Sequence, residues 1–107
     1  MTDALDTQRL LDRLHAILLV DTLGAPYYET GHLPQAINIP PHKVRELAPV
    51  LLMDRSAEIV VYGNNGDSSN ARIVLEQLAR LGYTKLSLYV DGIEGWVTAG
   101  LPIESPP

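Results

Sequence analysis

The sequence predicts an α/β fold in which a central parallel sheet of four to five strands carries helices on both faces. Short apolar runs rich in β-branched residues, typical of buried strands, alternate with segments whose apolar residues recur at helical spacing. Because a strand that returns through a helix lies parallel to its predecessor, this alternation favours a parallel sheet between two helical layers. The length of 107 residues fits one domain spanning residues 1–107.

The N-terminal third predicts a helix, a strand and a long loop. Residues 5–15 place three leucines on one helical face and charged residues on the opposite face. The apolar run at residues 16–21 predicts a buried strand. Residues 22–35 are expected to form a loop that contains one helical turn around residues 27–30.

The middle of the chain predicts a short strand, two helical pieces and a longer strand. Residues 36–40, "AINIP", form the short strand. Residues 44–51 have helical spacing, but proline cannot sit inside a regular helix, so we expect two short helices with Pro49 opening the second. The β-branched run at residues 59–62 predicts the next strand.

An amphipathic helix is predicted after the loop at residues 63–69, "GNNGDSS". Its spacing places Leu75 and Leu78 on one apolar face, which we expect to pack on the sheet, and Gly82 is a plausible C-terminal cap.

The end of the chain predicts one more strand and one more helix. The strand covers residues 85–90, and the short helix covers residues 92–100 and turns Trp96 toward the core. The Pro-rich tail at residues 103–107 is expected to fray.

Charge and composition exclude several classes of partner. The net charge is -5 and no basic block occurs, which argues against nucleic acid or an anionic membrane as a partner. The apolar stretches are shorter than the roughly 20 residues of a membrane span. Acidic residues stand near the N-terminus where a signal peptide requires positive charge, so a cytoplasmic location is expected.

The chain has no cysteine, which excludes disulfides, thiolate metal sites and thiol catalysis. No cluster of histidine and carboxylate residues has metal-ligand spacing. We therefore expect neither a metal nor a cofactor.

Three ordered motifs resemble the rhodanese-like domain over nearly the whole chain. The family usually begins "LLDVR…EY…GHIPGAINIP", and this chain reads "LLVDTLGAPYYETGHLPQAINIPP". The family's "IVVYC", amphipathic helix and "GY" correspond to "IVVYGNNGDSSNARIVLEQLARLGY", and "LEGGIEGWKAAGLPVE" is similar to "YVDGIEGWVTAGLPIE". In the first motif the matching residues are Asp21, Tyr28, Gly31, His32, Pro34, Ala36 and Asn38.

The resemblance implies a three-layer rhodanese-like sandwich and, for the family, sulfur transfer. A cysteine at the first loop position takes a sulfane sulfur from a donor such as thiosulfate and passes it to a thiol or cyanide. The loop curls so that its backbone amides, at a helix N-terminus, stabilise the thiolate and the persulfide.

The resemblance also locates the site in this sequence. The family nucleophile maps onto Gly63, and the last loop position, often arginine, maps onto Ser68. Asp21 and His32 are the supporting residues that it implies. The resemblance thus gives the following active loop: Gly63, Asn64, Asn65, Gly66, Asp67, Ser68 and Ser69. Because the loop length and the following helix are retained, we expect the backbone cradle to be largely preformed, although the nucleophile is missing.

Two interpretations of this loop stay open. The two glycines permit unusual backbone angles and the amides converge at a helix N-terminus, so a small anion is one candidate ligand. However, Asp67 adds a carboxylate with no basic side chain to balance it, and capping of the helix by Asp67 or Ser69 is the simpler interpretation. Ser68 lacks the closing glycine of a nucleophile elbow and a positioned base, which disfavours a serine hydrolase.

The supporting residues also have plain structural interpretations. We expect His32 to fix its turn through a hydrogen bond and Asp21, at a strand end, to organise nearby loops. His42 follows two prolines and is expected near a helix start, on the surface.

Two functions follow. The first is a non-catalytic module that binds or regulates, with a protein partner. The second is a variant of an active rhodanese-type sulfurtransferase from which the cysteine was removed. Natural relatives with cysteine at the position of Gly63 would favour the second.

Overall fold

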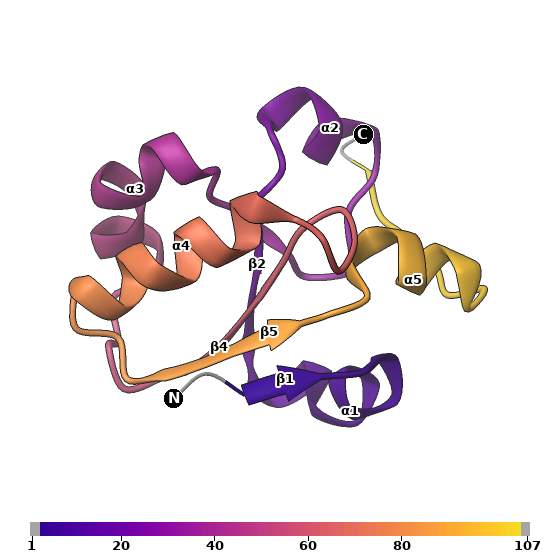
Figure 1. Cartoon of the computed structure of the whole chain (residues 1–107), viewed down its shortest axis with the longest axis horizontal. Helices are drawn as coiled ribbons and strands as arrows, with labels where there is room; N and C mark the ends of the chain where they lie inside the picture. The colour runs from indigo at the N-terminus through magenta and orange to yellow at the C-terminus, as the bar shows by residue number, and fades with distance from the viewer. Residues whose placement is uncertain (1–2, 106–107) are drawn as a thin grey trace.

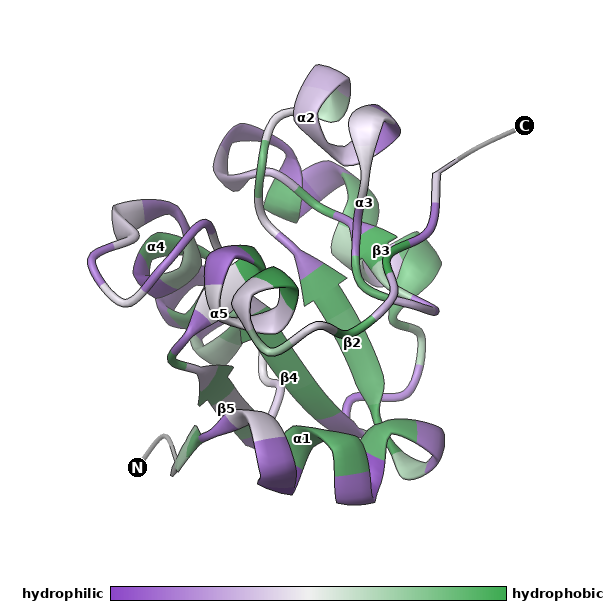
Figure 2. Cartoon of the chain, turned by 90° about the vertical axis from the view of Figure 1, so that its right-hand side faces the viewer, coloured by the Kyte–Doolittle hydropathy of each residue, from purple (hydrophilic) through white to green (hydrophobic). Residues whose placement is uncertain are grey.

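Five parallel strands form one sheet in the order β1-β5-β4-β2-β3 (Figure 1; β3 is labelled in Figure 2). The computed structural model describes residues 3–105. The strands are β1 (Asp3–Leu5), β2 (Leu18–Asp21), β3 (Ile37–Asn38), β4 (Glu58–Tyr62) and β5 (Lys85–Tyr89). The predicted parallel α/β sheet is confirmed, with five strands.

Helices cover both faces of this sheet (Figures 1 and 2). They are α1 (Thr7–Arg13), α2 (Ala25–Thr30), α3 (Val44–Leu51), α4 (Ser69–Arg80) and α5 (Gly92–Thr98), with 3-10 turns η1 (Leu14–Ala16) and η2 (Pro41–Lys43). No helix within residues 3–105 is long and apolar enough to cross a membrane.

The side chains of β4 alternate between two cores. Ile59 and Val61 pack with α3 and α4 on one face, whereas Val60 and Tyr62 pack with α1 and α5 on the other. This period of two is what a strand buried on both faces requires. The result is the three-layer sandwich that the sequence predicts.

Strand β1 is the main element that the sequence interpretation missed. It pairs with β5 at the sheet edge, from Asp3 opposite Ser87 to Leu5 opposite Tyr89. The observed helix α1 is shorter than the helix predicted at residues 5–15, because α1 begins after Asp6. The Asp6 carboxylate caps it by accepting a hydrogen bond from the Arg9 amide at 2.9 Å.

The predicted helix break at Pro49 is wrong. Helix α3 runs through Pro49 as one segment, and it is Pro41 that opens the preceding turn η2. Proline removes the hydrogen bond to the carbonyl of Arg45, four residues earlier. Both residues are exposed, so water can satisfy that carbonyl and the helix continues.

Three predictions for the C-terminal half are confirmed. Leu75 and Leu78 are buried in the core between α4 and the sheet. Gly82 follows the end of α4 with φ of 98°, the left-handed conformation typical of a helix terminus. Trp96 is buried on the other face, where its Nε1 donates a hydrogen bond to the Pro102 carbonyl at 2.7 Å.

The tail is paired where fraying was expected. His32 and Glu104 exchange two backbone hydrogen bonds of 2.8 Å in an isolated antiparallel bridge. The Ile103 side chain covers Gly31, because a Cβ on that glycine would lie 2.6 Å from Ile103 Cδ1. Residues 106–107 of the predicted frayed segment lie outside the described residues.

Candidate functional site

The loops that follow β2, β4 and β5 meet at the carboxyl edge of the sheet (Figure 1). In open parallel sheets, ligand sites form at this edge. The loop at residues 63–68 joins β4 to the N-terminus of α4, which is where the sequence places the active loop.

The space for a side chain on Gly63 is already filled. Gly63 is buried, and a Cβ on it would lie 2.5 Å from the Ser68 Cβ and still closer to the Ser68 hydroxyl. The cradle that the sequence predicts therefore has no room for a side chain at position 63 in this conformation. The loop closes on itself, and the Ser68 side chain stands where the nucleophile would begin.

Ser68 is also the residue that caps α4. Its Oγ accepts a hydrogen bond from the Ala71 amide at 3.4 Å, and α4 begins at the next residue. The prediction that Asp67 or Ser69 caps the helix is therefore wrong by one position, because the cap is Ser68, which lies between them. Ser69 is already the first helical residue, and Ser68 has the extended backbone that an N-cap requires.

Asn65 holds the loop in its bent form. Its Oδ1 accepts from the Asp67 amide at 2.9 Å, and its carbonyl accepts from the Ser68 amide at 3.1 Å. Its Nδ2 donates to the Glu94 carboxylate at 3.0 Å and so ties the loop to α5. An asparagine that bonds the amide two residues ahead is a common turn device, and this signal was present in "NNGD".

The start of α5 seals the loop from the other side. The amides of Ile93 and Glu94 donate to the carbonyls of Gly63 and Asn64, each at 3.0 Å. Gly92 has φ of 65°, and a Cβ there would lie 2.6 Å from the carbonyl groups of both loop residues. The first free amides of α5 therefore bind loop carbonyls and not an external anion. Sequence reasoning missed Gly92 and Glu94, although Gly92 matches the second glycine of "EGG" in the family's last motif.

Side chains of α4 fix the outer parts of the loop. Arg72 donates to the Gly66 carbonyl at 3.1 Å, and Asn70 donates to the Thr22 carbonyl at 3.1 Å. The second bond links the first turn of α4 to the loop after β2.

Asp21 lies at the end of β2, next to Tyr62 in the sheet register. Its carboxylate is buried and accepts from the Tyr62 hydroxyl at 2.5 Å and from the Leu23 amide at 2.8 Å. Burial raises the pKa of Asp21, and burial also raises the pKa of Tyr62. The Tyr62 hydroxyl in turn accepts from the Leu33 amide at 3.1 Å, so the pair connects two loops with the sheet.

His32 stacks on Tyr28, with ring centroids 3.9 Å apart and planes 6° from parallel. Its Nδ1 lies 2.9 Å from the Tyr28 carbonyl, and the Tyr28 hydroxyl donates to the Ala36 carbonyl at 2.6 Å. No hydrogen bond within residues 3–105 joins a histidine to Ser68.

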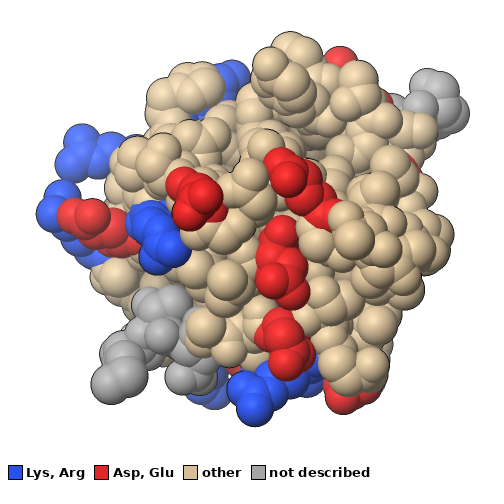
Figure 3. Space-filling view, turned by 45° about the vertical axis from the view of Figure 1, so that its right-hand side comes forward, with Lys and Arg blue, Asp and Glu red and all other residues tan. Residues whose placement is uncertain are grey.

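The surface around the loop is acidic. Exposed carboxylates belong to Asp67, Asp91 and Glu94. Acidic side chains form a column in the view that brings this side of the molecule forward (Figure 3). In the part of the chain that the structure describes, no group of three side chains could hold a metal ion.

Comparison with known proteins identifies relatives of this fold. The family profile described as "Rhodanese-like domain" matches residues 4–99. The HTH-type transcriptional regulator Rv0324 of Mycobacterium tuberculosis is 33% identical over 104 residues, which cover 95% of this chain and 45% of the regulator. An uncharacterized protein of Buchnera aphidicola is 26% identical over 88% of this chain and 68% of its own length.

Solved structures agree with the fold. The BH2092 protein of Bacillus halodurans has a TM-score of 0.88 at 25% identity, over 97% of this chain and 77% of its own. The thiosulfate sulfurtransferase of Pseudomonas aeruginosa has a TM-score of 0.84 at 22% identity, over 96% of this chain and 20% of its own.

Proposed function

Because the chain belongs to the rhodanese-like domain family and has no cysteine, we propose that it is a binding or regulatory module that does not transfer sulfur. The closed contact between Gly63 and Ser68 is the observation that supports this proposal most directly. A persulfide requires a sulfur nucleophile and room for it beside the loop amides. This loop has neither.

A relative supports the regulatory part of the proposal. The chain spans less than half of the mycobacterial transcriptional regulator, so in that protein the matching region accompanies further sequence. We propose that the present chain acts on a protein partner through its retained scaffold. The contacts of Asn65 and Glu94 make the loop a defined surface for such a partner.

A small anion at the loop stays a second candidate ligand. Amides at the N-terminus of α4 favour it, but Asp67, Asp91 and Glu94 surround the loop with negative charge. It would bind weakly.

A sulfur-transfer assay tests the catalytic half of the proposal. After incubation with thiosulfate and cyanide, we expect no thiocyanate above the buffer level, and intact mass measurement should show no added sulfur atom. An active cysteine-containing rhodanese serves as the positive control. Turnover that depends on this chain would overturn the proposal.

Affinity capture tests the binding half. The chain and its Asn65→Ala variant are compared as baits in extract of the source cells, with quantitative mass spectrometry. A protein captured by the natural loop and lost with Asn65→Ala supports a partner at the loop. Equal capture by both baits contradicts it.

The alternative of a cysteine-removed variant makes a different prediction. If the parent loop is open, then Gly63→Cys alone should restore sulfur transfer. The contact with Ser68 argues against this result.

A further inference from the structure

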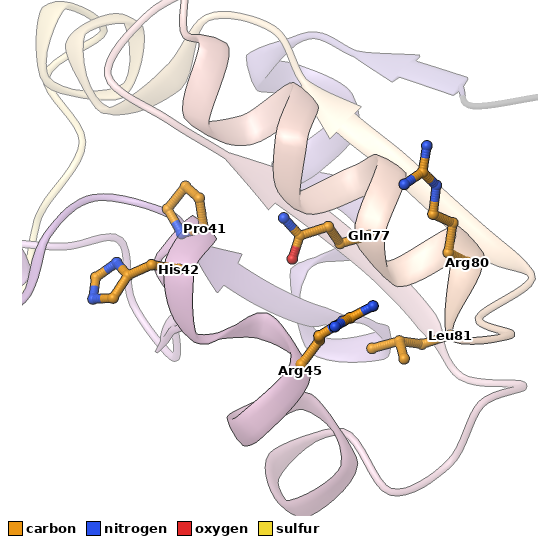
Figure 4. Close-up of a pocket in the computed structure, with 6 residues that line it drawn as sticks. All are labelled: Pro41, His42, Arg45, Gln77, Arg80 and Leu81. Atoms are coloured by element: carbon orange, nitrogen blue, oxygen red, sulfur yellow. The ribbon is translucent and has the colours of Figure 1, made fainter.

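A hollow lies between η2–α3 and α4, on the sheet face covered by α3 and α4 (Figure 4). Its volume is about 450 Å³, within the range of small-molecule sites. It is lined by Pro41, His42, Arg45, Gln77, Arg80 and Leu81. It borders the C-terminal half of α4, whereas the active loop joins the other end of this helix.

The charge of the lining is opposite to that of the whole chain. The chain has a net charge of -5, yet the hollow is lined by two arginines, a histidine and a glutamine, with no carboxylate. Arg80 is held by Glu76 one turn earlier at 2.5 Å. No carboxylate in residues 3–105 forms an ion pair with Arg45. Arg45 therefore has a guanidinium available for an external anion.

The side chains differ in how they face the hollow (Figure 4). Arg45 extends from α3 into the gap between the helices, and Gln77 reaches across it from α4 toward Pro41. The His42 ring points away from the gap, and Arg80 runs along the outer side of α4. Arg45 and Gln77 are thus placed for first contact, with Arg80 at the rim.

This donor set fits acidic oxygens on a carbon skeleton. A guanidinium binds carboxylate and phosphate groups through two parallel N–H bonds, and the glutamine amide adds a further donor. Pro41 and Leu81 supply apolar walls for the carbon atoms of a ligand. At the active loop, the Arg72 guanidinium already donates to the Gly66 carbonyl, and the exposed carboxylates of Asp67, Asp91 and Glu94 oppose an anion.

We propose that the hollow between η2–α3 and α4 binds a small organic anion, a phosphate ester or a polycarboxylate, through Arg45 and Gln77. The proposal goes beyond the binding function of the active loop, because it concerns a separate surface. It stands or falls independently of sulfur transfer.

Titration followed by heteronuclear NMR tests the proposal. Isotope-labelled protein is titrated at low salt with glycerol 3-phosphate, citrate and inorganic phosphate. We expect saturable shifts at the backbone amide of Arg45 and the side-chain amide of Gln77, with an organic anion binding more tightly than inorganic phosphate. The ranking of the first two probes separates phosphate from carboxylate recognition. Shifts centred on residues 63–69, no shifts, or equal binding of inorganic phosphate would overturn the proposal.

Matched arginine variants separate a built site from general charge. Arg45→Gln should weaken binding about tenfold or more, as expected for loss of a charged hydrogen bond. Arg9→Gln makes the same charge change on exposed α1, across the sheet, and should weaken binding less than about twofold. Arg45→Lys keeps the positive charge but cannot form the two parallel hydrogen bonds of a guanidinium. Its loss of affinity should lie between those of the other two variants. Equal losses from Arg45→Gln and Arg9→Gln would overturn the proposal.

Discussion

The side chain of Ser68 occupies the position into which a Cβ on Gly63 would project, with the Ser68 Cβ only 2.5 Å from that point. Two carbon atoms come this close only when covalent bonds connect them, directly or through one shared atom. The family motif is retained on both sides of the loop, yet its central space is closed. Local sequence therefore preserves the frame of the site without preserving its cavity.

The first prediction concerns the stability of Gly63→Cys. Because the new side chain meets Ser68, the variant should lose about 1–3 kcal/mol of the free energy of unfolding, as in overpacked cores. Ser68→Gly alone should lose only a few tenths of a kcal/mol, since glycine is tolerated at an N-cap. The double variant should recover most of the loss. Urea unfolding measures all three, and a stable single variant would show that the loop opens readily.

The second prediction concerns chemistry in the double variant Gly63→Cys/Ser68→Gly. Its thiol would stand near the N-terminus of α4, which should hold the thiol pKa below the ordinary value of about 8.5. The carboxylate of Asp67 limits this effect. We expect slow thiocyanate formation from the double variant, and less from Gly63→Cys/Ser68→Arg, because arginine retains the obstructing Cβ.

Thiolate absorbance against pH and thiocyanate formation provide the measurements for this prediction. A thiol that titrates at or above the ordinary value, with no persulfide in the intact mass, would show that the loop cannot form an anion cradle. Equal activity of the two double variants would show that the Cβ at position 68 is not the obstruction.

The strands and helices with strong periodicity could be predicted from the sequence. The apolar face of α4 and the β-branched run of β4 fix both elements locally. Strand β1 could not be found in this way, because three residues without β-branching carry no signal. It exists through its pairing with β5. The prediction of a helix break at Pro49 failed because the effect of the lost hydrogen bond depends on whether water reaches the free carbonyl of Arg45. The sequence does not show this exposure.

The position of the candidate site could be predicted, but not its closed form. The resemblance placed the loop at residues 63–69, and the structure places it between β4 and α4. The contacts that close it depend on Glu94 and Gly92, about thirty residues further along the chain. Side-chain pairs at such separations have no signature in a single sequence. The hollow beside Arg45 and Gln77 was missed for the same reason.

The third prediction tests the core of α4 with Leu78→Ala. Leu78 is fully buried between the helix and the sheet, so its truncation should cost about 2–5 kcal/mol. Ile73→Ala is the matched control, because Ile73 lies on the same helix and is 42% exposed. Urea unfolding should show a much smaller loss for the control. Similar losses at the two positions would contradict the packing of α4.

The fourth prediction concerns the pH dependence of stability. Burial raises the pKa of Asp21 above its ordinary 3.8, so the folded chain holds this proton more tightly than the unfolded chain. The resulting stabilisation is complete below 3.8 and is lost as the pH rises through the folded pKa. As the pH rises through the folded pKa of Asp21, the wild type should therefore lose stability relative to the Asp21→Asn variant.

Asp54→Asn provides a control of opposite sign. Hydrogen bonds from Ser56 lower the pKa of Asp54, so its contribution is present above 3.8 and is lost as the pH falls. Urea midpoints of the wild type and both variants over a pH series measure the two differences. If the difference for Asp21→Asn has the same slope as that for Asp54→Asn, burial does not govern the Asp21 carboxyl.

The last prediction concerns Gly92, which has φ of 65° at the start of α5. A Cβ on Gly92 would lie 2.6 Å from the carbonyl groups of Gly63 and Asn64, and backbone atoms cannot rotate away as a side chain can. Gly100 has φ of 79° but meets nothing within 4 Å of the same position. Gly100→Ala should therefore show only the left-handed penalty, about 1–2 kcal/mol.

Gly92→Ala should lose about 1–3 kcal/mol more than Gly100→Ala, because it adds a steric conflict to the same backbone penalty. The extra loss should be accompanied by shifts of the amide NMR signals of residues 63–68, since that loop must move. Urea unfolding and NMR spectra of both variants measure the two effects. Equal losses, or an unchanged loop spectrum in Gly92→Ala, would mean that α5 does not hold the loop closed. The shape of the loop would then depend on Asn65 and Ser68 alone.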